Sequence, residues 1–440
     1  MTRRDVELLA IGAGPSNLGL AVALEELAPE LAENSLIIER SQRIQWQQGM
    51  LLPWAKSQVS FLKDLVSLRN PRSKFSFLSH LHATGRLDDF INMSSFLPYR
   101  VEISDYLDWV ARSLTRVTLE LGRECVSVTA ERAFDGTLTR WLVTLADGTV
   151  ITSRYLVIGT GRDPYIPPPL AHLPPARVIH STQYRPRMAD LAREMPYRVA
   201  LIGSSQSAAE VYRALRHDLP GSEISWLIRA ASLTADQSSK FTNELYYPSY
   251  VDEFFAYPPP ARERILKEIY KTNYSCITPP MLEHLYTELY LDRLGRHETT
   301  RLITMVDITG AREAGDELEL ELTDRNTGRR SELRRDLIFL GTGFSWQTPR
   351  LVRQLADAIG LDQVVVTRRH QLVVNQPATA ACYLQGINEN THGIGDSLFS
   401  VLAHRAQDIT LDIVADRERR GSARLGAVGV GAAVPGEGDR

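Results

Sequence analysis

The stretch LLAIGAGPSNLGLAVALEELAPELAENSLIIE, residues 8–39, decides the fold of this chain. It predicts an apolar strand over residues 8–11, a turn with Gly12 and Gly14, a helix, and a second apolar strand that ends on Glu39. Glycines allow a tight turn and a close approach of the backbone to a pyrophosphate, whose charge meets the N-terminal amides of the helix. An acid at the end of the second strand accepts hydrogen bonds from ribose hydroxyls. The stretch therefore predicts a dinucleotide-binding βαβ unit.

This unit departs from the usual fingerprint at its third glycine, where Asn17 stands, and Gly19 follows two positions later. The alternative is an ordinary glycine-rich turn between a strand and a helix. The complete order of strand, turn, helix, strand and acid favours the nucleotide site. We expect five of its residues to contact the cofactor: Gly12, Gly14, Pro15, Asn17 and Glu39.

A second unit of the same kind begins at residue 198, in RVALIGSSQSAAEVYRALRHDLPGSEISWLIRA. Ser205 and Ala208 replace two glycines, and Arg229 stands where the first unit has its acid. An arginine there can pair with a ribose 2′-phosphate, so this unit is predicted to prefer NADP over NAD. The alternative is that Arg229 merely closes a strand at the surface. The predicted nucleotide contacts are Gly203, Ser205, Gln206, Ser207 and Arg229.

The composition is that of an ordinary soluble protein of two or three domains, with 440 residues, 43% hydrophobic content and a net charge of -3. Neither nucleic acid nor a membrane is an expected partner, because Lys and Arg show no excess and no apolar run is long enough for a signal peptide or a span. We expect a cytoplasmic protein. The three cysteines form no CxxC pair, which counts against a disulfide reductase, and no metal site is predicted.

Several motifs resemble those of the flavin-dependent N-hydroxylating monooxygenases of siderophore biosynthesis, specifically the L-ornithine N-monooxygenases. They are GAGPSNL from residue 12, QVSFLKDLVSLRNPRSKFSFLSHLHATGRL from 58, GSSQSAAE from 203, FTNELYYP from 241, KTNYS from 271 and NENTHGIGDSLFS from 388. The resemblance covers residues 12–413, and the VSLRNP pattern leans toward ornithine. It implies that FAD, NADPH and O2 produce a flavin hydroperoxide, which hydroxylates the side-chain amine of ornithine.

The resemblance also implies roles for single residues. Lys63 matches the lysine that pairs with the substrate carboxylate, and Asn243 the asparagine at the α-amino acid end. Asn273 matches the asparagine near the side-chain amine. Ser400 is the chosen serine near that amine, with Ser397 as second candidate. The implied catalytic set is Lys63, Asn273 and Gln58, the last beside the flavin, and the further cofactor contacts are Trp46, Thr342, Gly343, Asp396, Ser397 and Leu398.

Two positions depart from the family pattern. Gly341-Thr342-Gly343-Phe344 replaces Ala-Thr-Gly-Tyr, which removes a tyrosine hydroxyl, and Gln47-Gln48 replaces the His-Pro after the first tryptophan.

The predicted fold is α/β, with two Rossmann-like dinucleotide-binding domains, for FAD and NADPH, and a smaller substrate-binding insertion. We assign residues 1–165 and 336–420 to the FAD domain and 166–235 and 277–335 to the NADPH domain. The aromatic-rich residues 236–276 form the insertion, and we expect 421–440 to be a disordered tail. A strand at 336–339 and a helix starting near Asp396 are expected to lie in the FAD domain.

Several interpretations stay open at this point. Lys63 could form a surface pair with Asp64, Asn243 and Asn273 could be turn or capping residues, and His392 could be a catalytic base or a structural histidine. The same reaction could act on lysine or a diamine. The chain could also be a monooxygenase of the Baeyer–Villiger type or a non-catalytic redox sensor. The expected partners are L-ornithine, O2 and further copies of the chain, as a homo-oligomer.

Overall fold

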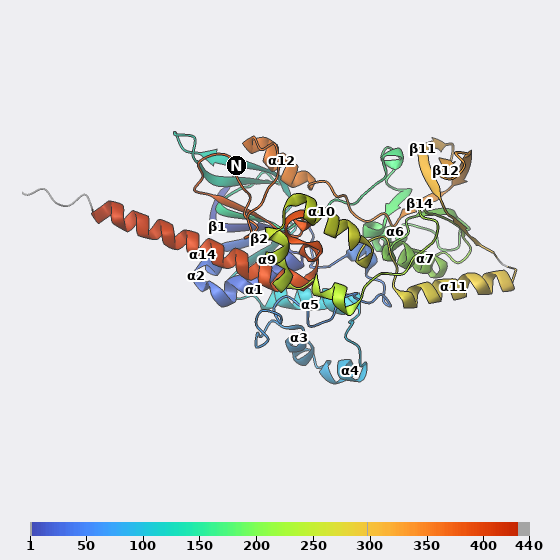
Figure 1. Ribbon diagram of the computed structural model, residues 1–440, viewed down its shortest axis with the longest axis horizontal. Helices are drawn as coiled ribbons and strands as arrows, with labels where there is room; N and C mark the ends of the chain where they lie inside the picture. The colour runs from blue at the N-terminus through green and yellow to red at the C-terminus, as the bar shows by residue number, and fades with distance from the viewer. Residues whose placement is uncertain (1, 297, 430–440) are drawn as a thin grey trace, which may run out of the picture.

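The computed structural model describes residues 2–296 and 298–429. Two largely parallel sheets lie side by side along the long axis of the molecule, each covered by helices (Figure 1). This arrangement confirms the predicted α/β fold with two Rossmann-like domains. The first sheet has the order β3 (Thr118–Leu121), β2 (Ser35–Glu39), β1 (Arg3–Ile11), β6 (Val150–Ile158), β5 (Leu138–Leu145) and β4 (Cys125–Arg132), with β15 (Ala381–Leu384) also beside β6.

The predicted βαβ unit forms the centre of this sheet. Strands β1 and β2 run parallel, with Leu8 opposite Ser35 and Ile11 opposite Ile38, so their carboxyl ends meet at one edge. Their apolar side chains are buried on both faces, as expected for a strand between two layers of helices. The covering helices are α1 (Pro15–Leu27), α5 (Arg100–Ser113) and α14 (Phe399–Gly429) on one face and α12 (Arg350–Ile359) on the other.

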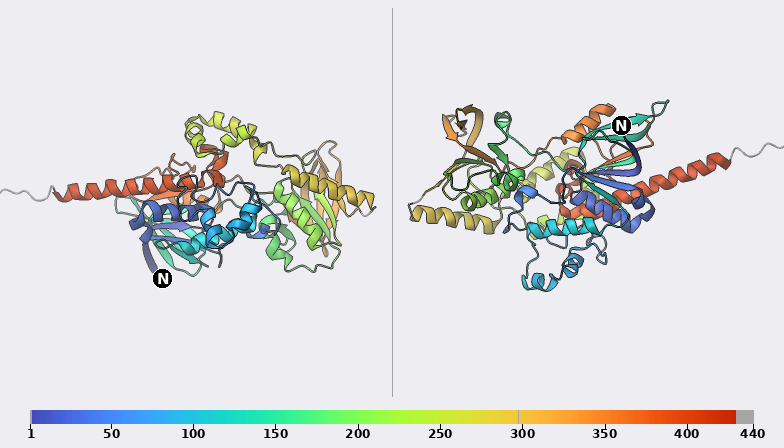
Figure 2. Two further views of the ribbon diagram at one scale, coloured as in Figure 1. Left: turned by 90° about the horizontal axis from the view of Figure 1, so that it is seen from below. Right: turned by 180° about the vertical axis from the view of Figure 1, so that it is seen from behind.

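The second sheet is parallel throughout. Its order is β10 (Thr300–Ile303), β9 (Glu223–Leu227), β8 (Arg198–Ile202), β14 (Leu337–Leu340) and β7 (Val178–His180). Helices α7 (Gln206–Asp218) and α11 (Pro279–Leu294) pack on one face, and an antiparallel sheet of β11 (Val306–Ala314), β12 (Glu317–Asp324) and β13 (Arg330–Arg335) packs on the other (Figure 2).

One of our predictions for this region is wrong. The strand at 336–339 does not return to the first domain, because β14 pairs with β8, placing Leu337 opposite Val199. An apolar strand before a glycine turn occurs in both sheets, so the local pattern does not reveal which sheet the strand joins. Further along this domain, β10 and β11 are separate strands, because Met305 takes a φ of 52° and turns the chain between them.

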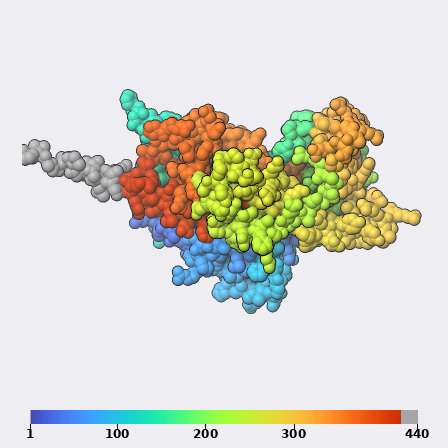
Figure 3. Space-filling model, in the orientation of Figure 1, coloured from blue at the N-terminus to red at the C-terminus, as the bar shows by residue number. Residues whose placement is uncertain are grey.

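The aromatic-rich segment forms a helical insertion with α8 (Lys240–Glu244), α9 (Pro248–Ala256) and α10 (Pro259–Glu268). Its two ends meet, since Ala235 forms a backbone bridge with Ile277. The insertion covers the front face, between the C-terminal part of the first domain and the second domain (Figure 3). The remaining helices are α2 (Pro29–Glu33), α3 (Phe77–Ala83), α4 (Leu87–Asn92), α6 (Tyr184–Met188) and α13 (Glu389–His392), with short 3-10 turns that include η4 (Tyr270–Thr272) and η5 (Ile394–Ser397).

The C-terminal helix differs from our prediction at both ends. It begins at Phe399 rather than near Asp396, because η5 precedes it, and it continues to Gly429 although we expected a tail from residue 421. Residues 430–440 of that predicted tail lie outside the described residues. Over 2–296 and 298–429, the structure has no helix with the length and apolar character needed to cross a membrane.

Candidate active site

The first glycine turn lies between β1 and α1. Gly12 has a φ of 90°, and a Cβ on it would lie 3.0 Å from the carbonyl oxygen of Gly159. Gly14 precedes α1 without a side-chain capping bond, and no atom of the described residues lies within 4 Å of a Cβ built on it. The Ala13 amide donates to Glu39 Oε2 at 2.8 Å, which fixes the predicted ribose acid beside the turn. Because the space beside Gly14 at the start of α1 is open, this turn fits a pyrophosphate.

The fully buried Asn17 holds this turn from inside. Its Nδ2 donates to the carbonyl oxygens of Ile11 at 2.9 Å and Gly12 at 2.7 Å, and its Oδ1 accepts from Gln385 Nε2 at 2.8 Å. These three bonds occupy the side-chain amide with protein groups, so a cofactor contact of Asn17 stays a prediction for its backbone amide. Pro15, as predicted, is the first residue of α1.

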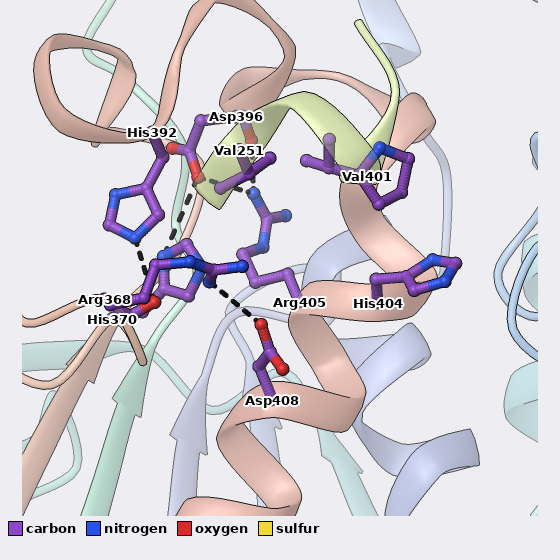
Figure 4. A pocket seen from close by; sticks show the side chains of 10 residues that line it. Val251, Arg368, His370, His392, Asp396, Val401, His404, Arg405 and Asp408 are labelled. Atoms are coloured by element: carbon purple, nitrogen blue, oxygen red, sulfur yellow. Dashed lines mark hydrogen bonds and ion pairs between the residues drawn. The ribbon is translucent and has the colours of Figure 1, made fainter. Parts of the chain in front are cut away.

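Asp396, another predicted cofactor contact, belongs to a buried network. Arg405 on α14 donates to Asp396 Oδ1 at 3.2 Å, to Gln385 Oε1 at 3.1 Å and to Ser16 Oγ at 2.8 Å. The Asn388 amide also donates to Asp396, at 2.7 Å. Figure 4 shows the Arg405 guanidinium pointing toward this carboxylate. Asp396 is fully buried and bound by these groups, so it supports the first turn of α1 through Arg405.

The contacts of His392 are all with other protein groups. Its ring stacks on that of His370 with centroids 3.9 Å apart, and both of its ring nitrogens have partners, Thr391 Oγ1 at 2.8 Å and the Arg368 carbonyl oxygen at 3.2 Å. Burial lowers the pKa of His392. The structure therefore favours the structural interpretation over a catalytic base.

The second glycine turn repeats the design of the first. Gly203 has a φ of 132°, and a Cβ on it would lie 2.3 Å from the Gly341 carbonyl oxygen. Ser205 precedes α7 without a side-chain capping bond between described residues, and its hydroxyl donates to the same carbonyl at 3.2 Å. Gln206 Oε1 accepts from the Thr278 amide at 3.0 Å, which ties α7 to the end of the insertion. The Gln206 amide donates to the Cys276 carbonyl oxygen at 3.0 Å, so a second nucleotide would meet the following amides of this turn, those of Ser207 and Ala208.

Ser207 and Arg229 flank this turn. Ser207 is half-buried in the first turn of α7, and Arg229 is exposed two residues after the end of β9. The Arg229 carbonyl oxygen accepts a hydrogen bond from the Arg325 side chain at 2.9 Å. This bond fixes the backbone that carries the Arg229 guanidinium.

Thr342 and Gly343 lie where the chain crosses back toward the first domain. The Thr342 hydroxyl donates to the Tyr165 carbonyl oxygen, and the Gly343 carbonyl oxygen accepts from the Tyr165 amide and from His180 Nε2, both at 2.9 Å. Phe344, which replaces the family's tyrosine, is 47% exposed. These bonds join the two segments that connect the domains.

Lys63 lies in a half-buried position beneath the insertion. Its Nζ donates to Ser400 Oγ at 3.0 Å and lies 4.8 Å from the centre of the Tyr247 ring. Burial lowers its pKa. The neighbouring Asp64 carboxylate instead accepts amide hydrogen bonds, including that of Phe77 at 2.7 Å. The structure thus contradicts the surface pair of Lys63 with Asp64. Ser400 contacts Lys63, and its place near the substrate amine stays a prediction.

The two asparagines lie on the insertion. Asn243 is exposed on α8, four residues before Tyr247, and Asn273 is half-buried directly after η4. Gln58 is exposed, and its role beside the flavin stays a prediction.

The remaining predicted residues lie around the start of α14. Trp46 packs edge-on against Phe399 with ring centroids 5.0 Å apart, and Leu398 packs in a small apolar cluster with the insertion. Ser397 Oγ lies 3.5 Å from the Tyr274 hydroxyl. Among the described residues, no group of three His, Cys, Asp or Glu side chains could hold a metal ion.

Comparisons with known proteins agree with this geometry. Residues 4–346 match the family model described as L-lysine 6-monooxygenase/L-ornithine 5-monooxygenase. The L-ornithine N(5)-oxygenase of Arthrobotrys oligospora is 33% identical over an alignment of 426 residues, and the match covers 92% of this chain and 88% of that protein. The chain belongs to this monooxygenase family.

Solved structures of similar enzymes share the whole architecture of this family member. The ornithine hydroxylase of Pseudomonas aeruginosa is 33% identical with a TM-score of 0.87, and the match covers 94% of this chain and 99% of that one. The ornithine N-hydroxylase of Kutzneria sp. 744, described with reduced FAD, NADP+ and L-ornithine, is 30% identical with a TM-score of 0.87 and is matched over 94% and 100% of the two chains.

Sequence reasoning missed a buried ion pair in this monooxygenase. Arg100 at the start of α5 makes two hydrogen bonds to Glu210 on α7, at 2.8 and 3.0 Å, and a third to the Met50 carbonyl oxygen at 2.7 Å. Both side chains are buried, and they join the two domains beside the second nucleotide turn. Glu210 stands at the end of the GSSQSAAE motif, so a polar residue on the buried face of that helix was the available signal.

Proposed function

We propose that this chain hydroxylates the side-chain amine of L-ornithine with FAD, NADPH and O2, giving an N-hydroxyornithine of the kind used in hydroxamate siderophores. The observation that carries the proposal is the half-buried Lys63 ammonium, held against Ser400 Oγ at 3.0 Å and covered by Tyr247 of the insertion. A cation in that position can bind the carboxylate of an amino acid. FAD, when bound, supplies the transfer of reducing equivalents from NADPH to O2.

The nucleotide turns support this choice of cofactors. Glu39 uses one oxygen for the Ala13 amide and the other for the Ser41 amide, at 2.8 and 2.9 Å, and its remaining lone pairs can accept from a ribose. We assign FAD to this first turn. In the second turn the Gly203 amide bonds to the Leu227 carbonyl oxygen as the Gly12 amide bonds to that of Ile38, so Arg229 lies one residue beyond the position that matches Glu39. Arg229 is exposed there and able to pair with a 2′-phosphate, so we assign NADPH to this turn.

Lys63 would set the reach of the substrate. Its charge fixes the carboxylate, and the side chain of ornithine then extends a set distance toward the flavin, which aligns the reacting atoms. The ornithine amine has a pKa like that of lysine, about 10.4, and its ammonium form has no lone pair to attack with. A site for this reaction must therefore favour the neutral amine through desolvation and uncharged partners. The side-chain amide of Asn273 is such a partner.

Mass spectrometry of the products tests the proposal directly. Purified protein with FAD, NADPH and O2 should add one oxygen to ornithine, less readily to lysine, and not to putrescine, which has no carboxylate for Lys63. Equal turnover of putrescine would contradict the role of Lys63. A lysine product alone would establish lysine as the substrate. Oxygenated ketones or sulfides would indicate a Baeyer–Villiger type of enzyme, and consumption of neither NADPH nor substrate would indicate a sensor.

A further inference from the structure

Four side chains from four separate segments form one cluster around the buried carboxylate of Glu389. Arg162 lies on the segment that leaves the first domain, and Trp346 on the segment that returns to it. Tyr274 belongs to the end of the insertion, and Glu389 begins α13. We call these four residues the linker clasp.

Glu389 is the centre of the linker clasp. Its side chain is 3% exposed, its Oε1 accepts from the Tyr274 hydroxyl at 2.6 Å, and Arg162 lies 3.2 Å from the same oxygen. The Arg162 guanidinium stacks over Trp346 at 4.6 Å, and the edge of Tyr274 meets Trp346 with centroids 4.9 Å apart. The two connecting segments are themselves paired, since Pro164 and Phe344 form a backbone bridge. The insertion is thus bonded to the crossing point of the domains.

The charge balance of the linker clasp favours a fixed arrangement. Burial raises the pKa of Glu389, and the Arg162 charge opposes that rise. Burial and the Glu389 charge raise the pKa of Tyr274, so its hydroxyl keeps the proton that it donates. A hydrogen bond to a charged group is stronger than one between neutral groups.

The backbone beside Tyr274 needs such an anchor. Ser275, the next residue, has a φ of 54°, in the left-handed region that costs energy for a residue with a side chain. Asn273, proposed to contact the substrate amine, is the residue before. The position of Asn273 therefore depends on how firmly Tyr274 is held.

We propose that Glu389 is a positioning residue for the amine end of the substrate site, holding Asn273 in place through Tyr274 and the crossing of the two domain-connecting segments. This inference rests on the proposed function, because it assigns Asn273 to the amine of ornithine. Loosening the linker clasp should raise the ornithine KM and let NADPH oxidation proceed without hydroxylation. Reduction of the flavin by NADPH should not change.

The test is Tyr274→Phe, which removes the hydroxyl and keeps the ring against Trp346. We expect its ornithine KM to rise about tenfold, the cost of losing one hydrogen bond to a charged group. The yield of hydroxyornithine per NADPH should fall, while anaerobic flavin reduction stays within about twofold of wild type. Glu389→Ala should show the same rise in ornithine KM and the same fall in yield, with flavin reduction unchanged. Glu389→Gln keeps an oxygen acceptor for Tyr274 and should restore most of the yield.

Tyr257→Phe is the matched control. Tyr257 also donates to a glutamate of the insertion, Glu253, but this pair is exposed on α9. Its KM and product yield should equal those of wild type. Unchanged KM and yield in Tyr274→Phe, or a loss in Glu389→Gln as large as in Glu389→Ala, would overturn the inference. A parallel fall of every rate together with the melting temperature would also overturn it. Absence of hydroxyornithine from the wild-type protein would instead refute the proposed function.

Discussion

Replacing Lys63 by alanine removes the cation to which we assign the ornithine carboxylate. The lysine is half-buried, so its charge is screened less than that of a surface lysine, and Ser400 Oγ holds it at 3.0 Å. A hydrogen bond to a charged group contributes about 1.5–3 kcal/mol, and 1.4 kcal/mol is a factor of ten in affinity. The ornithine KM of Lys63→Ala should therefore rise about 10- to 100-fold. Flavin reduction should not change, because both nucleotide turns are built from other segments.

Two measurements separate these effects. Steady-state hydroxyornithine formation gives the KM, and anaerobic stopped-flow reduction of the flavin by NADPH gives the reductive step. Lys56→Ala is a matched control, since Lys56 also lies over a tyrosine ring, Tyr99 at 5.4 Å, but is exposed. It should leave both quantities as in wild type. An ornithine KM in Lys63→Ala equal to that of wild type would refute the assignment of the carboxylate.

Further predictions follow from single contacts. Burial lowers the pKa of Lys63, and the charged form is lost as the pH rises through that lowered value, so the ornithine KM should rise at a pH below the usual lysine value of about 10.4. In Lys63→Arg a pH profile of KM should lack this rise, because arginine stays protonated. Arg229→Ala should weaken binding of NADPH about tenfold and leave that of NADH unchanged, as measured by flavin reduction. Asn17→Ala leaves Gln385 and two backbone carbonyls without their amide partner, so urea denaturation should show a loss of about 1–3 kcal/mol. We expect a homo-oligomer by light scattering, given the exposed apolar residues of α11, and a monomer would contradict this.

The parts of the fold that the sequence predicted are those set by local signals. In residues 8–39 an apolar strand, a glycine turn and a helix follow one another within the reach of neighbouring residues, and the observed β1, α1 and β2 agree with them. The change of composition at residue 236 likewise marked the insertion, which the backbone bridge of Ala235 and Ile277 closes. Such features need no knowledge of distant partners.

The errors concern residues whose role depends on distant partners. The pattern of β14 fits either sheet, and only its pairing with β8 and β7 places it in the second. The bond of Asn17 to Gln385, 368 residues along the chain, could likewise not be predicted from the local pattern. The site residues were found through family motifs, because the bonds of Lys63 to Ser400 and of Glu389 to Tyr274 join segments that local patterns do not connect.

Helix α14 couples the proposed substrate site to the first nucleotide turn. Ser400, in its first turn, meets Lys63, and Arg405, one turn further, bonds to Ser16 at the start of α1. Between them, Leu402 packs so closely on α1 that a Cβ on Gly19 would lie 2.3 Å from it. Gly19 therefore serves helix packing rather than nucleotide contact. Because one rigid helix carries all three contacts, the distance from the carboxylate-binding end to the flavin turn is fixed by packing, and a change at Gly19 should disturb both sites together.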